Sequence, residues 1–291
     1  MFVILAVFIF LLGIIIGSFL NVVILRYNTG MPIAADRSRC FSCGHSLGTL
    51  ELIPVLSYVI QRGRCKHCGA KISWQYPFVE LLTGFLFLAV FLGFPIGPIL
   101  AGIVPQALLL RLIFTLIYYY VIISILIVIM VYDLRHKIIP DGLVYTFIAL
   151  SLVYKLILIA ELPIYSRALW LDLAAGPIFF VIFFLIWYLS RGRAMGFGDA
   201  KLVLGIGFFL GLVQGTSALI LGFWIGAVVG IALLLFPYMQ KKLFPKASLW
   251  GGGKGLTIKS ELPFAPFLIL GLLIAFFFPI DILHLAVLLS L

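Results

Sequence analysis

The stretch Gly196-Phe197-Gly198-Asp199-Ala200-Lys201 lies between two long apolar runs and places an acidic residue where a hydrophobic helix is expected to begin. Ionising a carboxyl group close to hydrocarbon costs several kcal/mol, so an acid in this position needs a reason. The two glycines before it allow another backbone or a bound molecule to come close. Taken alone, the stretch is also compatible with a glycine-rich turn capped by Asp199.

A second acid occupies an equivalent place. Asp133 follows the apolar run that ends at Val131-Tyr132. Two carboxyl groups at the ends of different apolar helices predict an aspartic protease pair, in which the two groups share one proton. Asp141 competes with Asp133 for this role. Because Pro140 breaks the helix, Asp141 is better explained as the N-cap of the next one, which leaves Asp133 as the partner of Asp199.

The apolar composition defines the class of protein. Of the 291 residues, 64% are hydrophobic and 10% are charged, and the mean hydropathy is +1.27. A soluble domain does not carry this much apolar surface, so we expect an all-α polytopic membrane protein. There is little alternation with a period of two residues, which argues against a β-barrel. The net charge of +10 fits loops that face anionic lipid headgroups, so the expected partner is the lipid bilayer and not a nucleic acid.

The apolar runs predict about eight transmembrane helices. The expected spans are 1–25, 78–94, 111–130, 142–160, 170–190, 202–212, 217–236 and a last one that begins near Pro263. Residues 95–110 are predicted as an external loop or a half-embedded segment, and residues 237–262 as a loop. The density of glycine in the sixth and seventh spans favours close helix packing over mobility. No basic segment precedes the first apolar run, so no cleavable signal is expected.

The positive charges predict how these spans are oriented. With the N-terminus outside, all but three of the 20 Lys and Arg residues fall on the cytoplasmic side, the exceptions being Arg111, Lys155 and Arg167. The same orientation places Asp133 and Asp199 on the cytoplasmic side. A catalytic pair requires that coincidence, whereas two unrelated acids do not.

All four cysteines lie in the one long polar segment after the first span. They form the pairs Cys40-x-x-Cys43 and Cys65-x-x-Cys68. This spacing predicts a tetrahedral zinc site that folds a segment with little apolar core of its own, since structural zinc contributes ~10–16 kcal/mol in small domains. Two disulfides or free thiols are the alternatives, but the basic segment indicates the cytoplasm, where disulfides are disfavoured. His45 and His67 are expected to be surface residues.

Two further polar groups are assigned to the first two spans. Gly17, Ser18 and Asn21 share one face of the first helix, which predicts close packing on another helix with Asn21 bonded across the contact. Glu80 lies in the first turn of the second span, where the helix dipole favours an acid. It can also pair with an arginine of the polar segment or help to form a ligand site.

Several segments spread over nearly the whole chain resemble the bacterial type IV prepilin peptidases, a family that also processes the pseudopilins of type II secretion and of DNA-uptake competence. The matching segments are G-S-F-L-N-V-V-I-x-R at Gly17–Arg26, both C-x-x-C pairs, I-P-x-x-S-Y at Ile53–Tyr58, R-G-R-C-x-x-C at Arg62–Cys68, Y-P-x-V-E at Tyr76–Glu80, D-x-x-x-x-x-I-P-D at Asp133–Asp141 and G-x-G-D-x-K at Gly196–Lys201.

The resemblance implies a bifunctional enzyme of the bacterial inner membrane with its active site at the cytoplasmic face. Such enzymes cut the short basic leader from prepilins and pseudopilins, typically after glycine, and many then N-methylate the new terminal residue with S-adenosylmethionine. By resemblance Asp133 and Asp199 are the catalytic pair. We expect three neighbouring residues to support this site: Gly196 and Gly198 by admitting the substrate backbone, and Lys201 by contacting lipid headgroups or another helix.

The resemblance also implies a division of the chain. Residues 1–25 form the first transmembrane helix, residues 26–77 a methyltransferase-associated domain that holds zinc through the four cysteines, and residues 78–291 the protease core. Glu80 is the candidate residue for the methyl donor. Leu52 and the Ser73-Trp74-Gln75 run depart from the pattern of many members, and these departures concern methylation and leave cleavage untouched.

Three other classes of protein compete with this interpretation. A presenilin-like protease would keep the two acids but needs no four-cysteine segment. A transporter would place its acids near the bilayer midplane, whereas these are expected at the interface. A structural secretion component would tolerate the loss of either Asp133 or Asp199.

Overall fold

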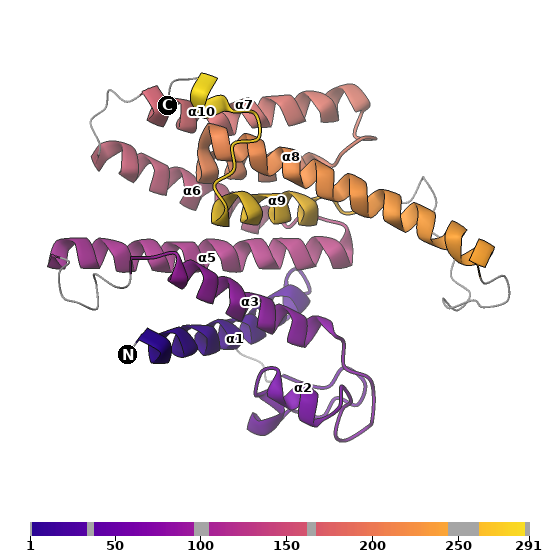
Figure 1. Ribbon diagram of the computed structural model, residues 1–291. Helices are drawn as coiled ribbons and strands as arrows, with labels where there is room; N and C mark the ends of the chain where they lie inside the picture. Colours follow the sequence, from indigo (N-terminus) through magenta and orange to yellow (C-terminus); the bar gives the residue numbers. More distant parts are fainter. Residues whose placement is uncertain (1, 34–37, 96–104, 162–166, 244–261, 289–291) are drawn as a thin grey trace. The chain divides into compact units, whose positions relative to one another are not determined.

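The structure is a computed structural model that describes residues 2–33, 38–95, 105–161, 167–243 and 262–288. The chain divides into two compact units, Met1–Val128 and Ile129–Leu291, and each is considered by itself. Nearly all of the described secondary structure is helical (Figure 1). The elements are α1 (Phe2–Arg26), η1 (Thr49–Leu52), α2 (Leu56–Ile60), α3 (Gln75–Leu92), α5 (Gln106–His136), α6 (Asp141–Glu161), α7 (Arg167–Ser190), α8 (Phe197–Leu243), α9 (Ala265–Phe277) and α10 (Leu285–Leu288).

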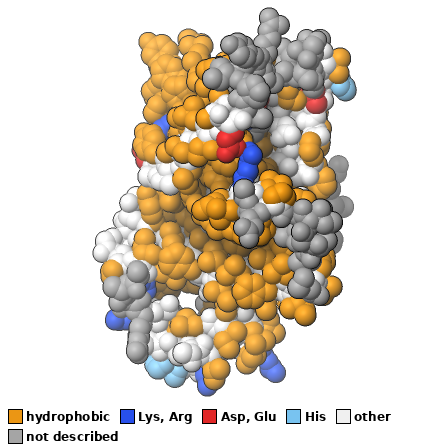
Figure 2. Space-filling model, turned by 90° about the vertical axis from the view of Figure 1, so that its left-hand side faces the viewer, with side chains coloured by type: hydrophobic (Ala, Val, Ile, Leu, Met, Phe, Trp, Pro, Cys, Tyr) orange, Lys and Arg blue, Asp and Glu red, His pale blue; other side chains and the backbone are white. Residues whose placement is uncertain are grey.

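Within the described ranges, six helices are long and apolar enough to cross a membrane, namely α1, α3, α5, α6, α7 and α8. The shorter α9 is also apolar. Helices suit these runs because a backbone in hydrocarbon must satisfy its hydrogen bonds within its own segment. Hydrophobic side chains cover most of the face shown in Figure 2, as expected for a surface in contact with lipid tails. The prediction of an all-α polytopic membrane protein is confirmed.

The predicted sixth and seventh spans are two arms of one kinked helix, α8. Gly211 interrupts the helix with φ 79° and ψ −170°. The Asp172 side chain of α7 occupies this break, where one carboxylate oxygen accepts the Leu212 N–H at 3.0 Å and the other lies 3.2 Å from the Lys155 ammonium. A side chain on residue 211 would collide with this carboxylate, so the break requires glycine.

Two predicted loops are shorter than expected. Helix α5 begins at Gln106 and not at Arg111, because the residues after Pro105 (Gln106-Ala-Leu-Leu-Leu) all favour the helix. Helix α8 continues to Leu243 through Pro237, where the loop was predicted to start, since a proline removes only one helical hydrogen bond and membrane helices tolerate it. The rest of that predicted loop, residues 244–261, lies outside the described residues.

In the first unit, α1 and α3 are brought together by small residues. A Cβ on Gly13 would lie 2.8 Å from the Gly84 Cα, and a Cβ on Gly17 would lie 2.7 Å from the Glu80 Cα. The Asn21 amide donates to the backbone carbonyl of residue 76 at the start of α3, at 3.1 Å. The predicted packing face of the first helix is therefore confirmed, including its hydrogen bond across the contact.

In the second unit, glycines bring α8 against both of its neighbours. A Cβ on Gly207 would lie 2.5 Å from the Gly176 Cα of α7. In the other arm, Gly222 of α8 meets Gly271 of α9 with backbone against backbone. The predicted role of these glycines in close packing is confirmed.

Candidate active site and metal site

Asp133 and Asp199 lie at opposite kinds of helix end. Asp133 is in the last turn of α5 and Asp199 in the first turn of α8, and their side chains are buried, with exposed fractions of 4% and 6%. One oxygen of Asp199 accepts the Gly196 N–H at 3.2 Å. Asp133 accepts a hydrogen bond from the backbone N–H of Ala265, the first residue of α9.

Each of the two carboxyl groups keeps one oxygen free. Among the described groups, Oδ2 of Asp133 and Oδ1 of Asp199 are buried and have no hydrogen-bond partner. The two side chains interact electrostatically with each other. Buried polar atoms are rarely left unpartnered, and two like charges this close do not both ionise cheaply, so the pair is suited to share a proton and to bind a polar group between them.

The ammonium group of Lys201 pairs with a carboxylate other than those of Asp133 and Asp199. Its ammonium forms an ion pair with Asp141, the first residue of α6, and lies 5.3 Å from the ring centre of Tyr145 and 5.2 Å from that of Phe197. A separation of two residues turns Lys201 about 200° around the helix from Asp199, which is why it reaches another helix. Asp141 was expected to be the N-cap of α6. It is instead the first residue of the helix, and its carboxylate makes this interhelical contact.

The two glycines of the motif differ in their surroundings. A Cβ on Gly198 would lie 3.0 Å from the Cβ of Ile139, so this glycine allows the start of α8 to pack against the segment before α6. Gly196 supplies the N–H that Asp199 accepts. The prediction that these glycines admit a substrate backbone remains a prediction. Sequence reasoning missed Ala265, although the Pro263-Phe264-Ala265-Pro266 run marks a helix start there.

The four cysteines occupy two loops of the same form in the first unit. In one loop the Cys40 N–H donates to the carbonyl of residue 45 at 2.9 Å, and in the other the Cys65 N–H donates to the carbonyl of Ala70 at 2.8 Å. Each loop turns at a glycine of positive φ, Gly44 (70°) and Gly69 (71°). The sequence carried this signal, since a glycine directly follows the second cysteine of each pair.

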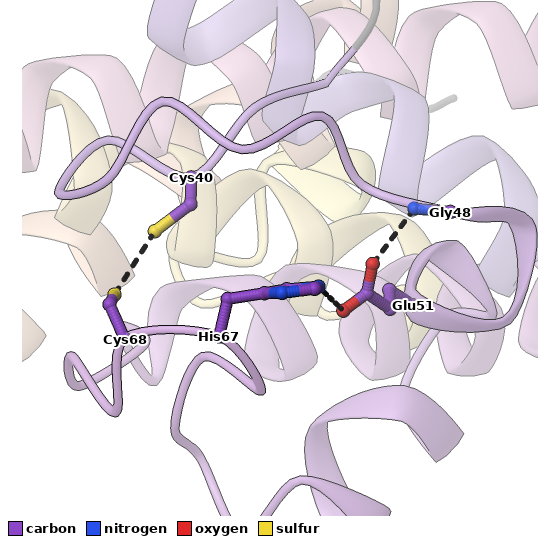
Figure 3. A network of polar contacts seen from close by, with 5 residues as sticks. All are labelled: Cys40, Gly48, Glu51, His67 and Cys68. Atoms are coloured by element: carbon purple, nitrogen blue, oxygen red, sulfur yellow. Dashed lines mark hydrogen bonds and ion pairs between the residues drawn. The ribbon is translucent and has the colours of Figure 1, made fainter.

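The four sulfur atoms form one cluster. Their Sγ atoms all lie within 4.8 Å of one another, and those of Cys40 and Cys68 are 3.9 Å apart (Figure 3). Four thiolates bound to one zinc ion at ~2.3 Å in a tetrahedron lie about 3.8 Å apart, whereas a disulfide needs about 2.05 Å. The cluster therefore fits a metal ion of this kind and does not fit two disulfides.

The thiols in this cluster titrate differently. Backbone N–H groups of Cys43 and then of Ser42 lower the pKa of the Cys40 thiol to about 6. The Ala70 N–H lowers the pKa of Cys68, but desolvation and the neighbouring thiols outweigh it and raise that pKa to about 11. A divalent cation bound between four sulfurs this close would stabilise their thiolate forms.

Glu80 lies in α3 and its side chain is buried, with an exposed fraction of 5%. One carboxylate oxygen accepts the Val55 N–H at 2.7 Å, and Ser18 also hydrogen-bonds to the carboxylate. Val55 has a positive φ of 60°, an uncommon conformation that this hydrogen bond helps to hold. The structure therefore gives Glu80 a structural contact, and its binding of a methyl donor remains a prediction.

Comparison with known proteins identifies the family of this chain. The family model of the bacterial peptidase A24 N-terminal domain matches residues 11–94, and that of the type IV leader peptidase family matches residues 120–231. A Bacillus subtilis protein named prepilin leader peptidase/N-methyltransferase is 31% identical over 92% of this chain and 92% of its own length. The chain belongs to the type IV leader peptidase family.

Other members of the leader peptidase family show the same relation. A Klebsiella pneumoniae protein of the same name is 31% identical over 70% of this chain and 84% of its own length. A Myxococcus xanthus member is 56% identical, but over only 29% of this chain and 25% of its own length. No solved structure matches the chain. The two matched regions contain the four cysteines with Glu80 and the two aspartates, respectively, and together with the apolar helices they identify a multi-pass membrane protein.

Proposed function

We propose that this protein is a membrane aspartic endopeptidase that removes the leader from type IV prepilins and pseudopilins at the cytoplasmic face of the bacterial inner membrane, and that it N-methylates the new N-terminus. The observation that carries the peptidase is the pair Asp133 and Asp199, two buried carboxyl groups that each keep one unpartnered oxygen. The names of the relatives supply the substrate class and the second activity.

The chemistry follows from a pair of carboxyl groups that hold one proton between them. The ionised group accepts a proton from a water molecule, whose oxygen attacks the scissile carbonyl carbon. The protonated group donates a hydrogen bond to the carbonyl oxygen and so stabilises the developing negative charge. When the C–N bond breaks, the leaving nitrogen takes a proton from the pair, and one shared proton remains on Asp133 and Asp199.

Backbone groups hold the pair ready for this reaction. The Gly196 N–H and the Ala265 N–H each occupy one carboxylate and so orient its free oxygen. Both donors come from the start of a helix, α8 for Gly196 and α9 for Ala265, where N–H groups are not used by the helix itself. The buried position excludes bulk water, which strengthens each of these interactions.

Cleavage of a prepilin in membranes tests the peptidase. Asp133→Asn and Asp199→Asn are each expected to lower the cleavage rate by at least about 10³-fold, because neither variant has two ionisable groups to share a proton. Asp281→Asn is the matched control, since it removes a carboxylate that instead accepts the Leu285 N–H at 2.9 Å. Full cleavage by either variant of the pair would refute the proposed active site.

For methylation, we propose that the four cysteines hold structural zinc and that S-adenosylmethionine is the methyl donor. Bound zinc would neutralise the thiolates of Cys40, Cys43, Cys65 and Cys68 and fix the two loops around them. Transfer of a labelled methyl group to an already processed pilin separates the two activities. We expect Asp199→Asn to retain this transfer while it loses cleavage, and absence of methyl transfer by the wild-type protein would remove this half of the proposal.

A further inference from the structure

Three side chains next to the cysteine cluster have no part in the function proposed above. His45, Glu51 and His67 place one ligand-type atom each, a ring nitrogen or a carboxylate oxygen, within 4.8 Å of one another. Figure 3 shows His67 and Glu51 pointing toward each other beside the contact between Cys40 and Cys68. His45 and His67 were expected to be surface residues, and the structure brings them together because both belong to the cysteine loops.

One oxygen of the Glu51 carboxylate is held by a hydrogen bond, and the other has no hydrogen-bond partner among the described residues. Its Oε2 atom accepts the Gly48 N–H at 2.9 Å, while its Oε1 atom is buried and has no hydrogen-bond partner. The Nε2 atom of His67 lies 3.7 Å from Oε1, which is too long for a hydrogen bond. Two atoms bound to one zinc ion at ~2.1 Å, with angles between about 109° and 120°, lie about 3.4–3.6 Å apart, close to this separation.

The two imidazoles lie face to face beside this oxygen. The ring centres of His45 and His67 are 3.5 Å apart and the rings are inclined by 35°. Both side chains are exposed, so an ion could reach them from solvent. Imidazole nitrogens are common zinc ligands.

We propose that His45, Glu51 and His67 form a second zinc site, separate from the four-cysteine site, with its fourth position open to water. Two ring nitrogens and one carboxylate oxygen are the ligand set of zinc sites that keep an open position. The Gly48 N–H orients the carboxylate from behind, as outer hydrogen bonds do at metal sites. Exposure of both histidines makes this ion more exchangeable than one held by four thiolates.

Counting metal in the full-length protein tests the proposal. The detergent-solubilised protein is dialysed against buffered free zinc, and zinc per chain is measured by mass spectrometry. We expect two zinc ions in the wild type and one in Glu51→Gln and in His67→Ala. Loss of a direct ligand should weaken the second site by more than the ~10–100-fold that follows loss of an outer hydrogen bond. Glu51→Gln is informative because its amide oxygen can still accept the Gly48 N–H.

The controls separate a second site from damage to the first. His136→Ala removes an exposed histidine of α5 and should leave two zinc ions bound. Cobalt in place of zinc reports on the cysteines, because thiolate ligands give an intense charge-transfer band and the second site gives only weak bands. The charge-transfer band should survive in Glu51→Gln. A single zinc ion in the wild type, an unchanged count in the variants, or loss of the thiolate band would each overturn the proposal.

Discussion

The four-cysteine segment and the helical second unit differ in where their polar groups lie and in what holds each region together. The segment between α1 and α3 is polar, and its described elements are only η1, α2 and two isolated bridges, Arg39–Ser46 and Arg64–Lys71. The second unit has a core of apolar side chains and glycine contacts, and buries Asp133 and Asp199 within it. The first region has a cluster of four cysteines and little apolar core, whereas the second has an apolar core that contains two carboxyl groups.

This difference teaches where each region is vulnerable. If a metal ion joins the four thiols, the segment depends on that ion, because little apolar burial remains to stabilise it without the ion. A bundle held by backbone contacts between glycines depends on the absence of side chains at those contacts. Substitutions that act on one kind of support should leave the other region intact.

The largest effect is expected from removing the thiols. Cys40→Ser with Cys43→Ser should unfold the polar segment, since structural zinc supplies ~10–16 kcal/mol in small zinc domains. Trypsin should then cut quickly at Arg62 and Arg64, while the helices of the second unit remain protected. The measurement is the time course of proteolysis, followed by mass spectrometry of the fragments.

Ser42→Ala is the matched control for this experiment, because residue 42 lies between the two cysteines and contributes only its backbone N–H to Cys40. A chelator added to the wild type should reproduce the double variant, and added zinc should reverse it. Equal protection of the variant and the wild type would mean that apolar contacts and not a metal hold the segment.

The second prediction breaks the glycine contacts of the bundle. Gly207→Ala places a Cβ 2.5 Å from the backbone of Gly176 and should cost about 3 kcal/mol, the upper end of overpacking penalties, because a backbone cannot move aside as a side chain can. Gly230→Ala is the control in the same helix, since its Cβ meets only Leu262 Cδ1, at 3.7 Å. That change should stabilise α8 by up to ~1 kcal/mol. The free energy of unfolding of both variants is measured in mixed detergent micelles. A change of the same sign in both variants would contradict the packing argument.

Much of this architecture could be predicted from sequence, for reasons visible in single residues. The cysteine pairs fix their own geometry through local loops, so their convergence followed from spacing. Asp133 and Asp199 were predictable because an acid next to an apolar run is costly. The family match covers their positions, and their catalytic role remains a prediction.

Contacts between distant segments were not predictable from pattern alone. Nothing near Ala265 indicates that its N–H meets Asp133, because that contact depends on how α9 packs. The pairing of Lys201 with Asp141 likewise joins two helices whose order in the chain does not fix their distance. Helix ends were the other weak point, since α5 begins directly after Pro105 and not at Arg111, and α8 continues through Pro237.

The third prediction concerns the contact between the polar segment and α3. Glu80→Ala should leave the partly buried Val55 N–H without its acceptor and cost about 1 kcal/mol, the lower end of the penalty for an unsatisfied donor, because water can still reach part of the site. Glu80→Gln keeps an acceptor and should cost less than about 1 kcal/mol. Proteolysis at Arg62 and Arg64 reads out stability, and labelled methyl transfer reads out binding of the donor. Loss of methyl transfer in Glu80→Gln with unchanged proteolysis would assign Glu80 to the donor site.

The smallest effect is expected at the ion pair between α6 and α8. The Asp141 side chain is 60% exposed whereas that of Lys201 is 10% exposed. When the ion pair is lost, water can therefore hydrate the Asp141 carboxylate more easily than the Lys201 ammonium. Lys201→Met leaves a carboxylate that water can hydrate and should cost less than ~1 kcal/mol. Asp141→Asn leaves the buried Lys201 ammonium without its ion pair. The ammonium still lies over the rings of Tyr145 and Phe197, and these cation–π contacts offset ~0.5–1 kcal/mol of the lost stability.

Asp141→Asn should therefore be the more destabilising of these two changes, although the carboxylate it alters is the more exposed side chain. A double-mutant cycle in mixed micelles measures the coupling between them, which we expect to stay at or below about 1 kcal/mol. A much larger coupling would mean that the pair is shielded from water, and α6 and α8 would then be joined by charge as well as by the packing of Gly205 on Phe147. The reverse order of the single variants would mean that Lys201 has another acceptor when Asp141 is absent.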